Sequence, residues 1–281
     1  MRVEVTEKTP QKLLTKASGF LKGYTHTLNP YIGCAFGCSY CYVRQSPVGL
    51  FRKQEWGTWV DVKKDVKEKL AKEMRLLRKK EQAISIFMSS STDPYQPVEH
   101  KEEVTRTLLE VMAEEPPDFL FVQTRSPLVT RDIDLLKKLG DRVMVSITIE
   151  TDLEEVRKRF SPSAPPIPAR LKALKILHKE GIPTQVAIAP ALPFSEGFAL
   201  KLKGIVDRVC VDDFTGDGSG GKRTARLGVY EKYEMGEKTK WVEGNVQQEV
   251  FEVMRTVFPE EQVIRSPEGF FPPKVQWNTK A

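Results

Sequence analysis

The sequence lacks any run of about 18 apolar residues, so it offers no segment that could cross a bilayer as a helix. Its first residues include acidic side chains and no apolar stretch after the early positive charge, which is unlike a secretory signal. We therefore expect a cytoplasmic protein with no membrane partner. Internal repeats of about 20–50 residues are also absent, apart from the alternation of strands and helices described below.

Cysteine is scarce, and its distribution is uneven. The 281 residues include four cysteines, three of which lie between Cys34 and Cys41. Such bunching in a reducing compartment points to metal binding more than to a disulfide framework.

The composition excludes a disordered or fibrous chain, because 40% of the residues are hydrophobic and 29% are charged. The formal net charge is +6 and the isoelectric point is about 9.0. This charge favours polyanionic partners, with DNA or another nucleic acid first among them. A solvated surface rich in Lys, Arg and Glu that has no such partner would give the same net charge.

Apolar, β-branched runs alternate with amphipathic charged stretches, a pattern typical of repeated strand–helix units and a parallel sheet. The pattern predicts six strands, at Thr27–Ile32, Ile84–Ser89, Phe119–Gln123, Val143–Ile147, Thr184–Ala189 and Ile205–Val211. Helices are predicted between them and near the C-terminus, at Val62–Lys80, Val104–Ala113, Ile133–Leu139, Pro168–Lys179 and Val246–Val257.

Three parts of the chain are expected: an N-terminal extension over 1–23, an α/β barrel over 24–213 and a C-terminal extension over 214–281 that borders the substrate side. Four glycines crowd together between Gly216 and Gly221, where the character of the sequence changes. We interpret the last part as an appendage rather than a seventh barrel repeat.

The chemistry is carried by Cys34, Cys38 and Cys41, which form a Cys-x3-Cys-x2-Cys motif directly after the first predicted strand. Three thiolates on one loop can bind three irons of a 4Fe-4S cluster and leave the fourth iron open for a substrate. A structural zinc site completed by Cys210 or His26 is an alternative, although no second Cys or His pair is present. Plain buried cysteines are the other alternative.

With Tyr40 before the third cysteine, the motif resembles the signature of the radical SAM superfamily. The chain is more narrowly similar, from about Tyr24 to Asp213, to the spore photoproduct lyase branch. This resemblance implies a partial (β/α)6 barrel of the TIM type with parallel strands. It also implies a 4Fe-4S cluster, S-adenosylmethionine as the molecule that is reductively cleaved, and an electron donor such as flavodoxin or ferredoxin.

The resemblance further implies which residues bind S-adenosylmethionine. The segment that ends the second predicted strand would meet the methionine amino group, although Ser, Thr and Asp there are also typical of a helix cap. Arg125 stands near a lysine that meets the methionine carboxylate in the lyases. The expected cofactor contacts are Tyr40, Ser90, Ser91, Thr92, Asp93, Arg125, Ser146, Thr148, Arg170 and Ala189.

Some residues favour the lyase reaction itself, and one position argues against it. Tyr40 and Tyr42 occupy the places of two tyrosines that are thought to help relay a hydrogen atom in the lyases. At the position of the hydrogen-donating cysteine, however, this chain has Ser90 or a neighbouring serine. Cys210 could take over as the donor. A free cysteine is more often buried, however, where it packs as a small apolar residue.

A glycine-rich segment from Gly216 to Arg223 nearly matches a phosphate-binding P-loop, but Arg223 stands where Ser or Thr must hold magnesium. We therefore reject nucleotide hydrolysis. Contacts to a DNA or RNA backbone are predicted for Lys222, Arg223 and Arg226, with an ordinary surface loop as the alternative.

The sequence thus predicts a radical SAM enzyme that acts on nucleic acid. Repair of thymine dimers is the most specific form of this hypothesis. Two alternatives stay open. One is a radical SAM enzyme with a peptide, RNA or small-molecule substrate, and the other is a non-catalytic, metal-stabilised nucleic-acid-binding protein.

Overall fold

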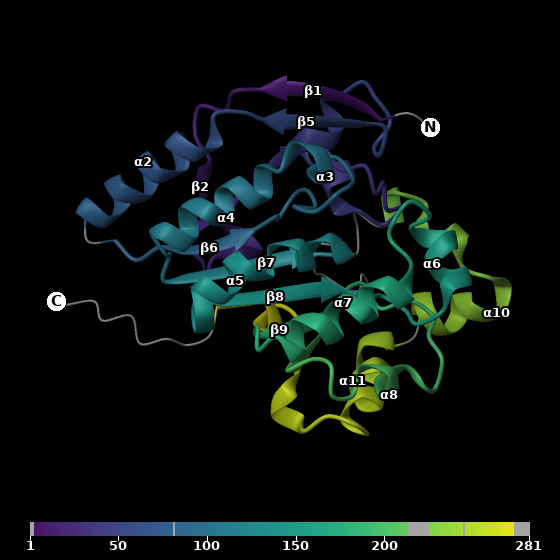
Figure 1. Ribbon diagram of the computed structural model, residues 1–281. Helices are drawn as coiled ribbons and strands as arrows, with labels where there is room; N and C mark the ends of the chain where they lie inside the picture. The colour runs from purple at the N-terminus through teal and green to yellow at the C-terminus, as the bar shows by residue number, and fades with distance from the viewer. Residues whose placement is uncertain (1–2, 81, 213–224, 244, 273–281) are drawn as a thin grey trace.

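The computed structural model describes residues 3–80, 82–212, 225–243 and 245–272. A curved, mostly parallel sheet runs through the centre of the molecule, and helices cover its outer face (Figure 1). The end strands, β2 and β11, do not pair with each other in the described part of the chain, so the barrel stays open.

The main sheet follows the order of the chain. From β3 to β11 every neighbouring pair is parallel, and β2 is added antiparallel to β3 at one end. The strands, in sheet order, are β2 (Leu14–Lys16), β3 (His26–Leu28), β6 (Ser85–Met88), β7 (Phe119–Thr124), β8 (Val143–Thr148), β9 (Thr184–Ile188), β10 (Arg208–Val211) and β11 (Val263–Arg265). Sequential parallel strands joined by helices are the arrangement of a partial TIM barrel, so the predicted fold class is confirmed.

Each crossover helix turns an apolar stripe to the sheet. On α2, for example, Val66, Leu70 and Met74 are buried at three- to four-residue spacing. No described helix is long and apolar enough to cross a membrane. The helices are α1 (Pro47–Leu50), α2 (Val66–Lys79), α3 (Glu99–Glu102), α4 (Val104–Glu114), α5 (Ile133–Leu139), α6 (Glu154–Phe160), α7 (Ile167–Lys179), α8 (Phe198–Leu202), α10 (Met235–Lys238) and α11 (Val246–Arg255).

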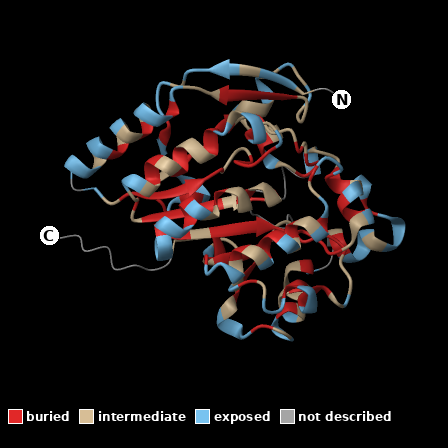
Figure 2. Cartoon of the chain, viewed as in Figure 1, coloured by how far each residue is buried: buried red, intermediate tan, exposed pale blue. Residues whose placement is uncertain are grey.

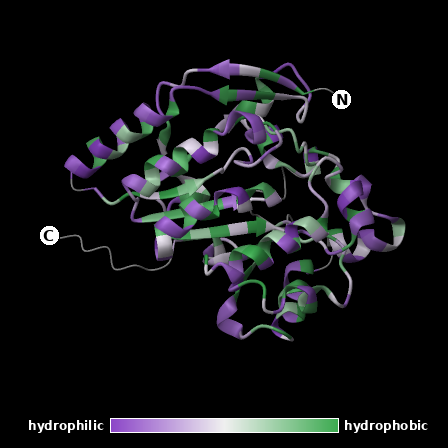
Figure 3. Ribbon diagram, viewed as in Figure 1, coloured by the Kyte–Doolittle hydropathy of each residue, from purple (hydrophilic) through white to green (hydrophobic). Residues whose placement is uncertain are grey.

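The strands separate an outer core from the barrel interior. Along β7, Leu120 and Val122 join the core beneath the helices, whereas Phe119 and Phe121 join a smaller aromatic cluster inside the barrel. Figure 2 shows the central strands of the main sheet buried and β1, at the edge of the small sheet, exposed, and Figure 3 shows the polar residues on the outer faces of the helices. Because side chains alternate, Gln123 and Arg125 continue the inward-facing row toward the carboxyl end of the sheet.

The first predicted strand is in fact two strands in two sheets. Asn29 and Pro30 interrupt it, and proline cannot donate a ladder hydrogen bond. The segment before the break is β3 of the main sheet, and the segment after it is β4 (Tyr31–Ile32). A separate three-stranded sheet holds β4 together with β1 (Glu4–Lys8) and β5 (Trp59–Lys63).

Three other sequence expectations are corrected. The helix predicted from Val62 begins at Val66, because Val62 and Lys63 belong to β5. The sixth predicted strand begins at Arg208 rather than Ile205. Six parallel strands were expected, but β11 pairs in parallel with β10, so the C-terminal part contributes a seventh parallel strand rather than a mere appendage.

The loop after β4 depends on a glycine. Gly33 has a φ of +83°, and a Cβ on it would lie 2.6 Å from the Trp59 ring and 2.7 Å from the Trp59 carbonyl oxygen. Its own carbonyl accepts hydrogen bonds from Thr92 Oγ1 at 2.5 Å and from Gln96 Nε2 at 3.3 Å. Gly33 therefore fixes both the turn and its docking onto β5.

We predict that Gly33→Ala destabilises the protein far more than Gly181→Ala. Gly181 also has a positive φ, +74°, but a Cβ there meets open space, so its alanine should cost only about 1–2 kcal/mol of left-handed backbone strain. At Gly33 the clash with Trp59 adds about 1–3 kcal/mol. Urea unfolding of both variants checks this, and equal losses would contradict the close packing.

Candidate active site

The three cysteines lie on a short loop after β4 and all line one cavity. Two tight turns shape the loop, in which Gly37 N donates to Cys34 O at 3.3 Å and Cys41 N donates to Cys38 O at 3.1 Å. Ser39 N donates to Phe160 O at 3.0 Å and so attaches the loop to α6. A rigid loop thus presents the three thiols at the carboxyl end of the barrel.

Gln96 braces the same loop from the segment after β6. Its Oε1 accepts from Ala35 N at 2.8 Å, while its Nε2 donates to Thr92 Oγ1 at 3.0 Å as well as to the loop carbonyl described above. Gln96 is completely buried. No sequence pattern predicts this role, because a lone glutamine after Pro94 and Tyr95 gives no periodic signal.

The thiols fit a cluster better than a single ion. Burial raises the pKa of all three, and the charges of neighbouring cysteines raise the pKa of Cys34 and Cys41 further. Thiolates this close together therefore need a cationic partner. Within the described residues, no three His, Cys, Asp or Glu side chains form a group that could hold one metal ion, whereas a cubane spreads three ligands over three irons.

Neither residue that the sequence offered as a fourth zinc ligand reaches the cysteines. Cys210 is fully buried in β10, where a Cβ on Gly269 would lie 2.3 Å from its sulfur. His26 begins β3 at the opposite end of the strand from the cysteine loop, and its Nδ1 contacts Thr25 Oγ1 at 2.9 Å. Neither side chain lines the cavity.

Arg125, which the sequence analysis predicts as a cofactor contact, lines the cavity beside the cysteine loop. Its Nη1 lies 2.6 Å from Cys38 Sγ, 2.9 Å from the Tyr40 hydroxyl and 3.0 Å from Glu150 Oε1. Burial acts to lower its pKa, but the surrounding thiol, phenol and carboxylate groups outweigh burial and raise it. The guanidinium is therefore a permanent cation next to the cluster loop.

Glu150 is the residue that holds this arrangement together, and the sequence analysis missed it. It is 1% exposed, two residues beyond β8, and accepts from the Tyr40 hydroxyl, from Arg125 and from Arg170 Nη1 at 2.7 Å. Burial alone would raise its pKa, but the guanidinium groups of Arg170 and Arg125 prevail and lower the pKa to about 2. The carboxylate is therefore ionised and orients three partners at once.

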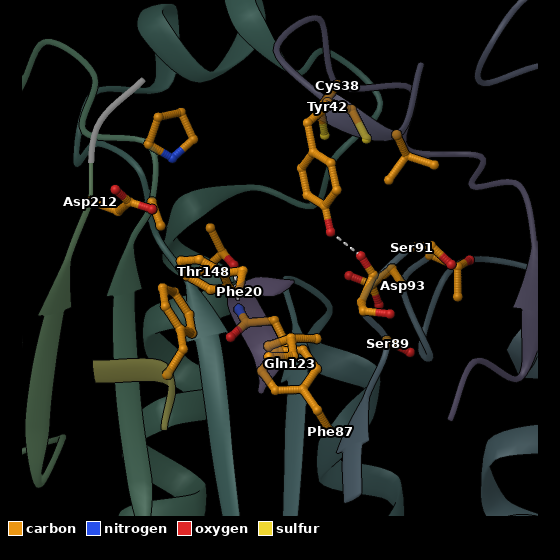
Figure 4. A pocket seen from close by; sticks show the side chains of 18 of the residues that line it. Phe20, Cys38, Tyr42, Phe87, Ser89, Ser91, Asp93, Gln123, Thr148 and Asp212 are labelled. Atoms are coloured by element: carbon orange, nitrogen blue, oxygen red, sulfur yellow. Dashed lines mark hydrogen bonds between the residues drawn. The ribbon is translucent and has the colours of Figure 1, made fainter. Parts of the chain in front are cut away.

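The segment Ser89–Asp93 lines the cavity beside the cysteine loop, and Figure 4 shows Ser89, Ser91 and Asp93 below Cys38. Asp93 accepts from Thr124 Oγ1 at 2.7 Å, from Arg125 N at 2.9 Å and from Tyr95 N at 2.9 Å. The cap-like role that the sequence offered as an alternative is therefore present. Burial raises the pKa of Asp93. A carboxylate has about four acceptor sites, so these three contacts leave one, and an ammonium group bound there would favour the ionised form.

Tyr40 and Tyr42 both line the cavity, but their hydroxyl groups are engaged differently. Tyr40 is buried and donates to Glu150, whereas Tyr42 is 43% exposed and donates to the Ser90 carbonyl oxygen. Of the other predicted contacts, Thr148 and Ala189 also line the cavity.

Several predicted site residues do not reach the cavity. Ser146 is fully buried and accepts from Gln185 Nε2 at 3.2 Å, so it faces the barrel interior below the site. Arg170 is fully buried behind Glu150 and donates to Thr148 O at 3.1 Å and Pro165 O at 2.8 Å. Both expectations of direct cofactor contact are corrected, since each residue supports a neighbour instead.

The expected hydrogen donor, Cys210, and one expected nucleic-acid contact, Arg226, also lie outside the cavity lining. Cys210 packs in the interior aromatic cluster under Phe270 and does not line the cavity, which corrects its assignment as a catalytic residue. Arg226 is exposed and outside the cavity lining. Lys222 and Arg223 lie outside the described residues.

The cavity has a volume of about 1000 Å³, near the upper end for small-molecule sites. Segments from both ends of the chain complete its wall: Ser18–Leu21, and beside it Phe270, with Gln247, Ser266 and Pro267; the rings of Phe20 and Phe270 lie 5.7 Å apart. It is therefore large enough for a drug-sized cofactor and part of a second molecule.

An open parallel α/β barrel with three loop cysteines at its carboxyl end is the architecture of an iron–sulfur protein with one cluster iron left free. A family model described as the Radical SAM superfamily matches residues 28–195, more than half of the sequence. The chain belongs to the Radical SAM superfamily, and its cofactors are a 4Fe-4S cluster and S-adenosylmethionine.

Curated relatives are themselves uncharacterised. A protein of Methanocaldococcus jannaschii is 33% identical over 173 residues, which cover 62% of this chain and 62% of the relative. A protein of Acidianus two-tailed virus is 33% identical over 59% of this chain and 56% of its own length. One of Mycobacterium tuberculosis is 26% identical over 60% and 50%. The chain thus spans less than two thirds of the length of these relatives.

Solved structures of spore photoproduct lyase share the fold. A mutant with bound AdoMet and dinucleoside spore photoproduct superposes with a TM-score of 0.63 and 14% identity, covering 93% of this chain and 81% of the lyase. A cysteine-to-serine mutant of the lyase gives a TM-score of 0.62 with the same coverage. At 14% sequence identity, the structural similarity establishes the fold alone.

We predict that Glu150→Gln lowers the free energy of unfolding at pH 7 by about 3 kcal/mol, because it removes the charge paired with two buried guanidinium groups. The folded-state pKa of about 2 lies below the ordinary 4.5, so the carboxylate stabilises the protein above pH 4.5 and loses this effect as the pH falls toward 2. Urea unfolding across this range should show the loss in the unmodified protein and not in the variant.

Glu180→Gln is the matched control, since Glu180 pairs with Lys137 at the surface. This variant should keep the acid-dependent loss. If both variants behave alike, Glu150 does not carry the buried charge network.

Proposed function

We propose that this chain is an enzyme that reductively cleaves S-adenosylmethionine and abstracts a hydrogen atom from a nucleic-acid substrate. The observation that carries the proposal is that the three thiols and Arg125 line one cavity at the carboxyl end of the barrel. When bound, the cluster and S-adenosylmethionine together supply methionine and a 5′-deoxyadenosyl radical, by transfer of one electron to the sulfonium.

Arg125 is the group that would hold the methionine carboxylate. Its contacts with described protein atoms run through Nη1 and the backbone N–H, so Nη2 and Nε face no protein partner there. A guanidinium binds a carboxylate through two parallel hydrogen bonds. The remaining acceptor site of Asp93 and the nearby side chains of Ser90, Ser91 and Thr92 suit the methionine ammonium group.

A nucleic-acid substrate is supported by charge and by fold. The net charge of +6 favours a polyanion, and the related fold of spore photoproduct lyase binds a dinucleoside photoproduct. Lys222, Arg223 and the exposed Arg226 follow the barrel and would meet a phosphate backbone. The wall formed by 18–21 and by the C-terminal segment would border this substrate.

Repair of thymine dimers in the manner of the lyases is less well supported. Such a reaction returns a hydrogen atom from a thiol, and the cysteines that line the cavity are the three of the cluster loop. Ser90 is a poor replacement, because a hydroxyl O–H bond is too strong to donate a hydrogen atom readily. We therefore propose hydrogen abstraction from nucleic acid, without assigning a lyase type.

The test uses anaerobically reconstituted protein with S-adenosylmethionine and dithionite as the reductant. Dithionite replaces the natural electron donor, for which we propose a flavodoxin or ferredoxin. Uniformly deuterated oligodeoxynucleotide is added in one sample and a deuterated peptide in another. We expect deuterium in 5′-deoxyadenosine only with the oligonucleotide. Cys38→Ala, which loses a cluster ligand, is the control without activity. Deuterium from the peptide alone would move the function to a peptide substrate, and colourless zinc-loaded protein would remove the enzyme assignment.

Arg125→Ala should leave the iron content unchanged and weaken binding of S-adenosylmethionine about ten- to hundredfold, because a charge-assisted partner is lost. Arg125→Lys should recover part of the affinity, since it keeps the charge but not the two-pronged geometry. Equilibrium dialysis with the cluster-loaded proteins measures this. Equal affinities for all three proteins would place the carboxylate elsewhere.

A further inference from the structure

The cavity has an aromatic floor, formed by Phe20, Phe87 and Phe270. All three residues line the cavity, and they come from three separate parts of the chain. Figure 4 shows Phe20 and Phe87 below Cys38 and Tyr42. The face of a phenyl ring carries partial negative charge, so the floor suits an uncharged flat group and not an anion.

A second layer of rings supports this floor from the barrel interior. Phe87 stacks on Phe121 with ring centroids 5.1 Å apart and 16° between the planes, and Tyr24 meets Phe87 edge-on at 5.3 Å. Phe121 also meets Phe270 edge-on at 6.3 Å. Phe121 and Tyr24 are both buried. Two of the three floor rings, those of Phe87 and Phe270, are therefore held in place by packing.

Phe20 differs from the other two floor residues in its exposure. It is 40% exposed, whereas Phe87 is 5% and Phe270 is 6% exposed. Because Phe20 also lines the cavity, its ring is the phenyl surface of the floor that a bound molecule can reach. The rings of Phe20 and Phe270 contact each other at 5.7 Å with an interplanar angle of 54°, so a flat ligand would meet the remaining face of Phe20.

An anchored turn between β2 and β3 presents Phe20 to the cavity. The turn includes the 3-10 helix η1 (Gly19–Leu21), in which Leu21 N donates to Ser18 O at 3.2 Å. Tyr24 N then donates to Leu21 O at 2.9 Å. Leu21 and Tyr24 both pack in the interior aromatic cluster. The residues on the far side of the turn are thus buried, while the Phe20 ring stays partly uncovered.

The floor lies deeper in the barrel than the proposed contacts of the methionine carboxylate. Phe87 pairs with Phe121 across β6 and β7, and Phe121 is four residues before Arg125. At about 3.3 Å per residue along a parallel strand, the two levels are roughly 13 Å apart. The cavity volume of about 1000 Å³ leaves space for a second molecule at the floor.

The charges around the cavity disfavour a phosphate inside it. Apart from the cysteine thiols, the ionisable side chains among the described lining residues are those of Arg125, Asp93 and Asp212, and lysine is absent from this set. Arg125 already faces Glu150 and would take the methionine carboxylate. The whole chain nevertheless has a formal net charge of +6. The outside of the protein therefore attracts a polyanion, whereas the cavity accepts an uncharged part of it.

We infer that Phe20 is the stacking residue for one unpaired nucleobase of the substrate, and that the phosphates next to this base stay outside the cavity. In a nucleotide the sugar separates the uncharged ring from the charged phosphate, which matches the division between the cavity and the outside of the protein. Every base has a flat face, so stacking holds a base without selecting its identity. A base that is paired must first leave its stack to reach such a pocket. The inference rests on the proposed function, because it names how a nucleic-acid substrate is held.

The experiment measures binding of two labelled probes to the cluster-loaded protein by fluorescence anisotropy, with S-adenosylmethionine and without reductant. One probe is a single-stranded oligodeoxynucleotide that contains all four bases. The other is its abasic counterpart, with the same sugars and phosphates but no bases. We expect the first probe to bind about tenfold or more tightly than the second, because the abasic strand keeps the electrostatic attraction and loses the stacking.

Phe20→Ala should remove most of this preference and leave the affinity for S-adenosylmethionine unchanged, because the ring contacts the second molecule and not the cofactor. Phe20→Tyr keeps a flat ring and should retain the preference. Phe51→Ala is the matched control, since Phe51 is 85% exposed but does not line the cavity. This control should behave like the unmodified protein. Unchanged cofactor affinity also shows that Phe20→Ala is folded.

Four results would overturn the inference. The first is equal binding of the two probes by the unmodified protein, which decides the question even if Phe20→Ala does not fold. The second is an unchanged preference in folded Phe20→Ala. The third is an equal loss of affinity for S-adenosylmethionine in that variant, which would assign the floor to the cofactor. The fourth is tighter binding of a blocked peptide that contains phenylalanine.

The two probes also separate this inference from the proposed function. If neither probe binds, the proposed action on nucleic acid fails together with the stacking role. If both probes bind alike, only the stacking role fails. Reductive formation of 5′-deoxyadenosine, measured separately, tests the cleavage of S-adenosylmethionine independently of either outcome.

Discussion

The site depends on one buried carboxylate, that of Glu150. It contacts Arg125, Arg170 and Tyr40, which come from the end of β7, from α7 and from the cysteine loop. Three separate parts of the chain are thereby fixed to the end of β8. Because the same Arg125 nitrogen also lies 2.6 Å from Cys38 Sγ, the position of the cluster loop relative to the barrel is set by charge as well as by packing. The two guanidinium partners offset the desolvation penalty of this buried carboxylate, which a lone charge would carry uncompensated.

The barrel supplies the second constraint, because its strands all end at the same edge. The segment after β6, Arg125 after β7 and Glu150 after β8 follow successive barrel strands and therefore meet in space. The cysteine loop joins them from the end of β3 by way of the short strand β4. The small sheet of β1, β5 and β4 then holds the cysteine loop from outside, through the close approach of Gly33 to Trp59. The candidate site is thus built from local loop geometry and a shared strand edge.

How far the sequence could predict this site depended on whether each signal was local. The spacing of Cys34, Cys38 and Cys41 is a property of one loop, and the alternation of apolar runs and amphipathic helices predicts the sheet. Glu150 and Arg170 are single charged residues, and nothing in their neighbourhood distinguishes a buried pair from solvated surface charges. The strand β11 has three residues and follows a segment without the strand–helix rhythm, so its pairing with β10 depends on tertiary contacts that the sequence pattern does not contain.

The placement of Cys210 is consistent with radical chemistry in the cavity above it. A thiol gives up its hydrogen atom readily, so an accessible cysteine near the cofactor would intercept a radical intended for the substrate. Cys210 is fully buried, and Gly269 covers its sulfur so closely that any side chain there would collide with it. Phe270, the next residue, then lines the cavity in its place. The C-terminal segment therefore does two things at once: it closes the wall of the cavity with a phenyl ring, and it separates the remaining thiol of the chain from the cavity.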